Sequence, residues 1–189
     1  MPAVAGVDLS ASPERPTGIA ILEKTNEYWE VVLLEELKSC DNCCIAQLLL
    51  DYRVTTVVVD APFSIPPKDK WFREVEREFL RIGGKLLPAA KGPMRKLAER
   101  AMKLVDILES RGLSVYETHP YSVLKLAGLS LEELLELLRV KNYPPKIKSK
   151  HKKDALVASL VAVCIEEGCS NAVVGRDGSI YYIDLSTTS

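Results

Sequence analysis

Two apolar runs that each end on an aspartate restrict the fold more than any other feature of this chain. The first is "AVAGVDL", which reaches Asp8, and the second is "VTTVVVD", which reaches Asp60. Runs as apolar as these are typical of strands buried on both faces of a sheet. A lone carboxylate there is costly unless it is paired, hydrogen-bonded or bound to a metal. We therefore expect the fold to bring partners to both positions.

The order of elements around these runs predicts an α/β fold. Short connections between the first three strands favour an antiparallel meander. A helix before the fourth strand allows that strand to run parallel to the first. We expect a five-stranded mixed sheet with helices on both faces and a C-terminal hairpin around Asp177-Gly178. This order of elements resembles the RNase H-like fold. The expected strands are 3–9, 17–23, 28–37, 54–60 and 113–117.

The remaining segments favour helices within a single domain covering residues 1–189, with a helical insertion at about 66–111. The helix at 154–168 is apolar on almost every side, so we expect it to be buried. Caps are expected at Asp41 or Asn42 for one helix and at Ser130, with its capping-box partner Glu133, for another. The expected helices are 41–52, 69–83, 94–111, 130–138 and 154–168.

Composition excludes several classes of protein. The net charge is −1, so no global basic field recruits nucleic acid. No apolar run reaches the length of a membrane span and no signal peptide precedes the first strand, so we expect a cytoplasmic protein.

The five cysteines are an odd number, which argues against a secreted disulfide framework. No second pair with suitable spacing accompanies Cys40 and Cys43, so a structural zinc site is not expected. We expect Cys44 and Cys164 to be small core residues, and the helical phase does not suggest Cys169 as a partner for Cys164. The single glutamine and the many lysines and glutamates favour a thermophilic source, where intracellular disulfides occur.

Four acids fall at the ends of apolar elements, namely Asp8, Asp60, Glu117 and Asp154. If the first, fourth and fifth strands lie side by side and parallel, three of these acids share the sheet edge where α/β folds place their sites. Crowded carboxylates need a proton or a cation, and Mg²⁺ or Mn²⁺ prefers such oxygen ligands. The alternative is that each aspartate forms a turn or begins a helix.

Several motifs together resemble one known family. They are "GVDLSAS", "TGIA", "VVVDAPFSIP", "ETHPYSVLK" and "KKDALVASLVA". The chain resembles, from about residue 3 to about residue 185, the family DUF429, a group described as predicted nucleases of RNase H-like fold. The resemblance implies that Asp8, Asp60 and Asp154 are catalytic metal ligands and that Glu117 is an additional ligand or a metal-facing neighbour. The usual nuclease fold has one helix between its fourth and fifth strands, and the two-helix insertion departs from this pattern. In this chain the insertion would cover the site or recognise the substrate.

Other residues are candidates for binding substrate. Cations before Asp154 are disfavoured at a helix N-terminus unless they face phosphates or the acidic site; these are Lys150, His151, Lys152 and Lys153. The alternative is a solvated charged loop. The hydroxyl of Ser10 could hold a phosphate or serve ordinary turn chemistry. His119 could shuttle a proton, contact the scissile phosphate, or hydrogen-bond within its own loop.

The function that these residues favour is a metal-dependent nuclease that uses Mg²⁺ or Mn²⁺ and binds DNA or RNA. One alternative is an ATP-using phosphotransferase of the actin-like group, because "GVDLSASPERPTG" faintly resembles a phosphate-binding turn. Enzymes of the actin-like group need two domains of this fold, whereas this chain is expected to form only one, which argues against this alternative. The other alternative is a non-catalytic binding module that retains the fold and binds no divalent cation.

Overall fold

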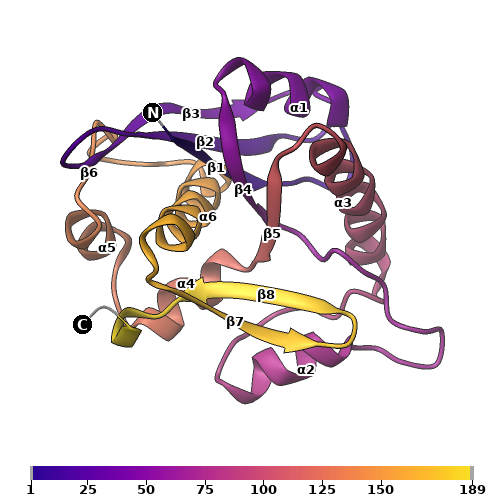
Figure 1. Cartoon of the computed structure of the whole chain (residues 1–189). Helices are drawn as coiled ribbons and strands as arrows, with labels where there is room; N and C mark the ends of the chain where they lie inside the picture. The colour runs from indigo at the N-terminus through magenta and orange to yellow at the C-terminus, as the bar shows by residue number, and fades with distance from the viewer. Residues whose placement is uncertain (1, 188–189) are drawn as a thin grey trace.

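A computed structural model of the protein describes residues 2–187 and contains an eight-stranded sheet (Figure 1). Residues 1, 188 and 189 of the predicted domain lie outside the described residues. The strands lie in the order β6-β3-β2-β1-β4-β5-β8-β7. They are β1 Ala3–Asp8, β2 Thr17–Lys24, β3 Trp29–Leu37, β4 Val54–Asp60, β5 Ser114–Thr118, β6 Val140–Lys141, β7 Ser170–Gly175 and β8 Gly178–Ile183.

The five central strands confirm the expected fold class. Strands β1, β2 and β3 are antiparallel, β4 runs parallel to β1, and β5 runs parallel to β4. The sheet is larger than the five strands expected from the sequence. The C-terminal hairpin joins it because β8 pairs in parallel with β5, and the two-residue strand β6 pairs with β3 at the opposite edge.

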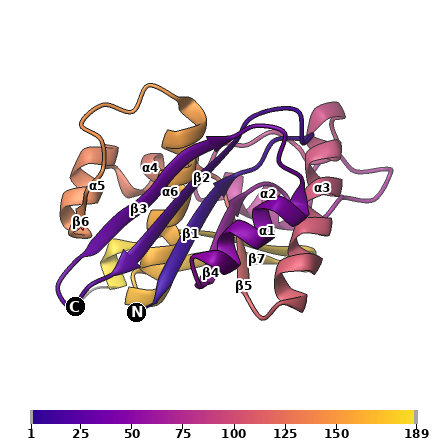
Figure 2. The same ribbon diagram turned by 90° about the horizontal axis from the view of Figure 1, so that it is seen from above.

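Helices cover both faces of the sheet (Figure 2). Helices α1 and α3 pack on one face and α6, with α4 and α5 beside it, on the other, while α2 packs against the β7–β8 hairpin. Strand side chains alternate between these two cores, as the pleat requires. The helices are α1 Asn42–Asp51, α2 Glu74–Arg81, α3 Gly92–Ser110, α4 Pro120–Ala127, α5 Leu131–Leu137 and α6 Lys150–Glu167, with a 3₁₀ turn at Leu185–Thr187.

Helix α6 is the buried helix that the sequence predicts, but it begins one turn earlier than expected. Ten consecutive residues, 155–164, are buried. The helix begins at Lys150 because Ser149 caps it, accepting a hydrogen bond from the Lys152 N–H at 3.2 Å. Asp154 therefore lies in the second turn, and the basic residues before it form the first turn instead of a solvated loop.

Two predicted caps are confirmed and one helix is shorter than expected. Asp41 caps α1 by accepting from the Cys44 N–H, and Ser130 and Glu133 form a capping box at α5. Helix α2 covers only residues 74–81 of the expected 69–83. The preceding residues form an extended loop that leaves the body of the molecule between β4 and α2 (Figure 1). None of the described helices combines the length and apolar character needed to cross a membrane.

The expectations for the cysteines are partly wrong. Disulfides join Cys40 to Cys44 and Cys164 to Cys169, and Cys43 is the free cysteine of the described residues. Cys164 lies in the core as expected, whereas Cys44 is exposed in the first turn of α1.

The pairing of Cys164 with Cys169 depends on the end of α6, where a helical phase no longer applies. Gly168 follows the helix with a φ of 77°, which turns the chain back over the last turn. The Cys169 N–H consequently bonds to the Cys164 carbonyl at 2.9 Å, and the two side chains meet.

Candidate metal centre

Strand register places Asp8 beside Asp60. The two residues are direct neighbours in the parallel β1–β4 ladder. Val4 and Val58, which have the same parity on these strands, pack in the core that includes α6. Because side chains alternate between faces, both carboxylates lie on the α6 side at the carboxyl ends of their strands.

Helix α6 supplies the third carboxylate. One oxygen from each of Asp8, Asp60 and Asp154 lies within 4.8 Å of the other two. All three side chains are partly buried. The structure therefore brings together the three acids that the sequence predicts as metal ligands, and we refer to them as the carboxylate cluster.

Two glycines allow α6 to lie close enough for this arrangement. A Cβ on Gly6 would be 2.1 Å from the Ala155 carbonyl oxygen, and one on Gly18 would be 2.1 Å from the His151 carbonyl oxygen. Gly18 is also the β2 neighbour of Asp8. Larger residues at these two positions would force the first turns of α6, and Asp154 with them, away from the sheet.

Burial is the main influence on the protonation of the carboxylate cluster. It raises the pKa of Asp8 to about 6, and the hydrogen bond with His151 acts in the opposite direction. It raises the pKa of Asp60 well above the usual range, and the charges of Asp8 and Asp154 add to the increase. Burial also raises the pKa of Asp154, against the attraction of Lys150. A cation would relieve all three costs.

His151 belongs to the carboxylate cluster more closely than its predicted role in substrate binding implies. Its Nδ1 lies 2.5 Å from Oδ2 of Asp8. His151 and Asp154 are three residues apart on α6 and so share one face of the helix. This face is directed at the strand ends that carry Asp8 and Asp60.

Glu117 lies outside the cluster, although it is buried nearby. On β5 the residue beside Asp60 is Thr118, so Glu117 has the opposite parity and faces the other side of the sheet. Both of its oxygens accept hydrogen bonds from Arg73, and one also accepts the Phe63 N–H at 2.8 Å. The structure therefore assigns Glu117 to a buried ion pair and not to the predicted additional ligand position.

Arg73 is a buried residue that the sequence does not reveal as such. Its spacing to neighbouring glutamates on α2 favours pairing on a helix surface. In the structure only 1% of Arg73 is exposed, and its Nε lies 3.2 Å from Glu76 while its other nitrogens bind Glu117. The pair with Glu117 connects the start of α2 to β5, beneath the cluster.

His119 occupies the N-cap position of α4, and its side chain hydrogen-bonds to a nearby residue. A local hydrogen bond of this kind is the alternative that the sequence leaves open to a role with substrate. Its Nδ1 lies 3.0 Å from the Ser122 hydroxyl, which donates to the Lys85 carbonyl and accepts the Lys85 N–H, each at 2.8 Å. The single hydroxyl proton is thus used, so Nδ1 carries the ring proton and Nε2 is an acceptor. Burial, with a contribution from Lys150, lowers the pKa of His119 to about 4, and the ring lines a cavity of about 30 Å³ with Asp60.

The other predicted substrate-binding residues divide into two groups. Lys150 lies 3.8 Å from Asp154 and remains largely exposed, so it faces the cluster. Lys152 instead pairs with Glu35 at 2.9 Å, and Lys153 is exposed. Ser10 is buried in the turn after β1, where its hydroxyl contacts four groups of the protein. The structure does not direct Ser10 toward the cluster.

Comparison with known proteins identifies the fold but no sequence family. No protein-family model matches the chain, and no curated protein matches it. Among solved structures it is similar to T. thermophilus RuvC in complex with Holliday junction substrate, with a TM-score of 0.54 and 16% identity, covering 89% of this chain and 97% of that one. It is also similar to another Thermus thermophilus RuvC structure, with a TM-score of 0.53 and 18% sequence identity. That match covers 88% of this chain and 96% of the RuvC chain. The chain has the RNase H-like fold of these proteins.

Proposed function

We propose that this protein is a metal-dependent nuclease that hydrolyses phosphodiester bonds, and that it is a member of DUF429. The observation that carries the proposal is the carboxylate cluster, three acids from β1, β4 and α6 whose oxygens lie within 4.8 Å of one another. They meet at the carboxyl ends of strands, where α/β sheets place their sites. RuvC, which shares the fold, is seen with a Holliday junction substrate, and this supports nucleic acid as the substrate class.

The cluster fits Mg²⁺ or Mn²⁺. Both are hard cations that prefer carboxylate oxygens as ligands. The cluster offers one such oxygen from each of three carboxylates, and these oxygens lie within 4.8 Å of one another. Asp8, Asp60 and Asp154 would hold the ion. A bound divalent cation would lower the pKa of a water molecule that it binds and would offset the negative charge of the phosphate.

The chain's own residues serve this chemistry in three ways. His151 orients Asp8 through the contact with Oδ2. Lys150 is exposed beside Asp154 and attracts the phosphate backbone. His119 is neutral near pH 7 and keeps Nε2 as an acceptor, so it can accept a hydrogen bond from a water or hydroxyl group in the cavity that it lines with Asp60.

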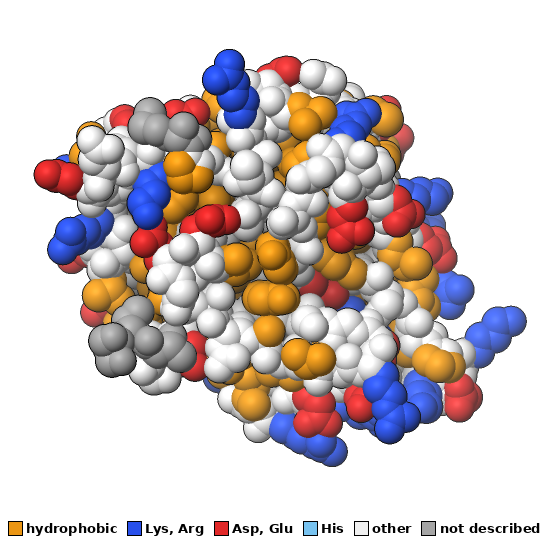
Figure 3. Space-filling model, viewed as in Figure 1, with side chains coloured by type: hydrophobic (Ala, Val, Ile, Leu, Met, Phe, Trp, Pro, Cys, Tyr) orange, Lys and Arg blue, Asp and Glu red, His pale blue; other side chains and the backbone are white. Residues whose placement is uncertain are grey.

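Basic side chains are available near the insertion for further contact with phosphates. Figure 3 shows lysines and arginines gathered over α2 and the loop before it, on the face seen in Figure 1. The exposed residues there include Lys68, Lys70, Arg77 and Arg81. A local patch of this kind is needed because the whole chain carries a net charge of only −1. The turn after β1 uses its hydroxyl groups internally, so no observation favours the phosphotransferase alternative.

The test is cleavage of labelled single-stranded, duplex and branched DNA, and of matching RNA, by purified protein with Mn²⁺. We expect cleavage of at least one substrate, and a loss of about 100-fold or more in Asp8→Asn, Asp60→Asn and Asp154→Asn. Asp106→Asn, on an exposed position of α3, is the matched control and should cleave like the wild type. Equal cleavage by all five proteins would show that a contaminant is responsible and would refute the proposal.

A further inference from the structure

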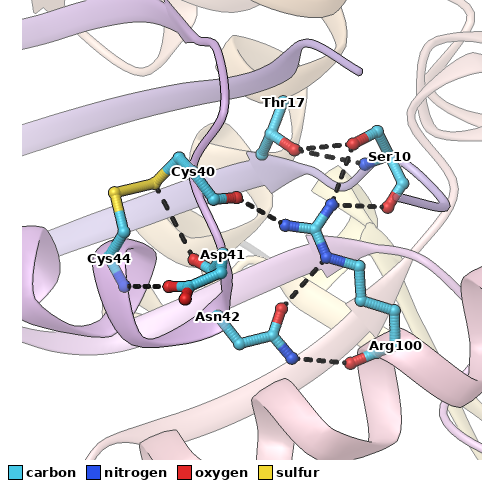
Figure 4. Close-up of a disulfide and its surroundings, with 7 residues drawn as sticks. All are labelled: Ser10, Thr17, Cys40, Asp41, Asn42, Cys44 and Arg100. Carbon is cyan, nitrogen blue, oxygen red and sulfur yellow. Dashed lines mark hydrogen bonds between the residues drawn. A yellow bond between two sulfur atoms is a disulfide. The ribbon is translucent and has the colours of Figure 1, made fainter. Parts of the chain in front are cut away.

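The side chain of Arg100, on α3, joins the start of α1 to the turn that follows β1 (Figure 4). Its Nη2 donates to the Cys40 carbonyl at 2.8 Å, and its Nε donates to the Asn42 side-chain oxygen at 3.1 Å. Its Nη1 donates to both the carbonyl oxygen and the hydroxyl of Ser10, each at 2.9 Å. Arg100 is only 8% exposed, so these bonds form away from solvent.

Ser10 connects this network to the carboxylate cluster. It lies two residues after Asp8, and both its N–H and its hydroxyl contact the Thr17 hydroxyl, at 3.3 and 3.0 Å. Thr17 adjoins Gly18, the β2 neighbour of Asp8. Ser10 therefore links the segment that follows Asp8 to the start of the neighbouring strand β2. A shift of Arg100 can reach Asp8, the proposed metal ligand, through Ser10.

The disulfide between Cys40 and Cys44 fixes one of the groups that Arg100 binds. Cys40 is buried and carries the carbonyl that accepts from Arg100, whereas Cys44 is exposed in the first turn of α1 (Figure 4). A groove of about 580 Å³ lined by Arg100 and Cys43 lies beside it. The other disulfide, between Cys164 and Cys169, is buried at both ends. A reductant in solution can therefore reach the first disulfide and not the second.

We propose that Arg100 is a positioning residue of the carboxylate cluster and that the Cys40–Cys44 disulfide holds it in place under oxidising conditions. This inference rests on the proposed function, since the property that it controls is the affinity of the cluster for a divalent cation. Positioning groups outside the ligand set commonly change metal affinity about 10- to 100-fold.

Reduction by a dithiol changes the state of the network in a balanced exchange. One thiolate of the dithiol attacks the sulfur of Cys44, the exposed residue of the pair, the bond to Cys40 breaks, and the Cys40 thiolate takes up a proton. The second thiol of the reductant then displaces Cys44, so two electrons and two protons pass to the protein and the reductant becomes a cyclic disulfide. Cys40 is then free to move, and its carbonyl no longer holds Arg100 at a fixed position.

The first experiment compares Mn²⁺ affinity, measured by calorimetry, before and after treatment with dithiothreitol and its anaerobic removal. Thiol titration should count one free thiol in the oxidised protein, from Cys43, and three after reduction, because the buried disulfide persists. We expect the dissociation constant for Mn²⁺ to rise about 3- to 10-fold on reduction. The double variant Cys40→Ser/Cys44→Ser should show the raised dissociation constant without reductant. Cys43→Ser should have the same dissociation constant as the wild type, both in the oxidised and in the reduced protein.

The second experiment tests Arg100 itself. We expect Arg100→Met to weaken Mn²⁺ binding about 10- to 100-fold, at a temperature where circular dichroism shows a folded protein, and Arg100→Lys to restore part of it. Lys96→Met, on the same helix and groove, is the control and should bind like the wild type. If oxidised wild type binds no Mn²⁺, the proposed function fails and this inference with it. If it binds Mn²⁺ and neither reduction nor Arg100→Met changes the affinity, only this inference is refuted.

Discussion

His151 is the residue on which the geometry of Asp8 most directly depends. Its ring nitrogen lies 2.5 Å from Asp8 and on the same helix face as Asp154. We expect His151→Gln to lower the rate of Mn²⁺-dependent cleavage about 10- to 100-fold, because Asp8 loses the group that orients it. Steady-state rates on the best nucleic-acid substrate provide the measurement.

The matched control for this prediction is Lys152→Gln. Lys152 is the next residue on α6, but it pairs with Glu35 on β3 and not with the cluster. We expect this variant to retain most of the wild-type rate, since exposed ion pairs contribute little. Equal losses in the two variants would mean that the charge of the basic turn matters and that the contact with Asp8 does not.

The sequence predicts the carboxylate cluster correctly because each member ends or begins an apolar element. Asp8 and Asp60 follow strands whose burial is evident from the residues alone, and Asp154 stands at the apolar part of α6. Glu117 has the same appearance, yet it faces the other side of the sheet. The difference depends on the register of β5 against β4, where Asp60 meets Thr118, and no local pattern encodes that register.

At the scale of elements, the contact of α6 with the sheet determines whether the cluster forms. A Cβ at Gly6 would meet two backbone atoms of α6, the Ala155 oxygen at 2.1 Å and the Ser159 nitrogen at 2.2 Å. We expect Gly6→Ala to lower the free energy of unfolding by about 3 kcal/mol or more, because a helix backbone cannot yield as a flexible side chain does. Urea denaturation measures the change, and Mn²⁺ affinity should fall with it.

Gly112→Ala separates this crowding from an ordinary backbone cost. Gly112 has a φ of 83° and open space around its Cβ position, so we expect a loss of about 1–2 kcal/mol and an unchanged Mn²⁺ affinity. If Gly6→Ala proves no more damaging than Gly112→Ala, α6 does not need the close approach that the structure shows.

The elements were predictable where a local signal exists and not where tertiary pairing decides. The caps at Asp41 and Ser130 follow from short-range chemistry and are confirmed. The predicted start of α6 falls one turn too late, because the basic residues of its first turn have the composition of a solvated loop and obscure the cap at Ser149. The disulfide at the end of α6 depends on the turn at Gly168, which helical phase cannot describe.

For the whole molecule, the sheet extends beyond its predicted five strands through contacts between distant parts of the chain. The C-terminal hairpin is recognisable from the sequence, but its pairing with β5 through β8 is not. The same hairpin carries Asp177, whose carboxylate accepts the N–H groups of Glu74 and Val75 at the start of α2. The buried pair of Arg73 and Glu117 then joins α2 to β5. The insertion is thus tied to the sheet at two points beside the cluster.

The raised pKa values of the carboxylate cluster predict how the stability of the whole protein depends on pH. The pKa of Asp8 is about 6 in the folded protein and 3.8 in its ordinary state. Between these values the folded protein holds a proton that the unfolded chain has lost, so the free energy of unfolding falls as pH rises through this window. The contribution of Asp8 is at most about 3 kcal/mol. Burial raises the pKa of Asp60 as well, so Asp60 adds to this fall in the free energy of unfolding.

We therefore expect Asp8→Asn, without metal, to be more stable than the wild type at pH 7.5 and to lose most of this advantage at pH 4.5. Added Mn²⁺ should stabilise the wild type at pH 7.5, where fewer protons compete for the carboxylate oxygens, and have little effect at pH 4.5, where protons compete strongly for the same oxygens. Urea denaturation of both proteins at each pH, with and without Mn²⁺, measures these differences, with Asp106→Asn as the exposed control. A constant difference between Asp8→Asn and wild type across the pH range would show that the folded protein does not raise the pKa of Asp8. The cost of burying its charge, which a cation would relieve, would then be absent.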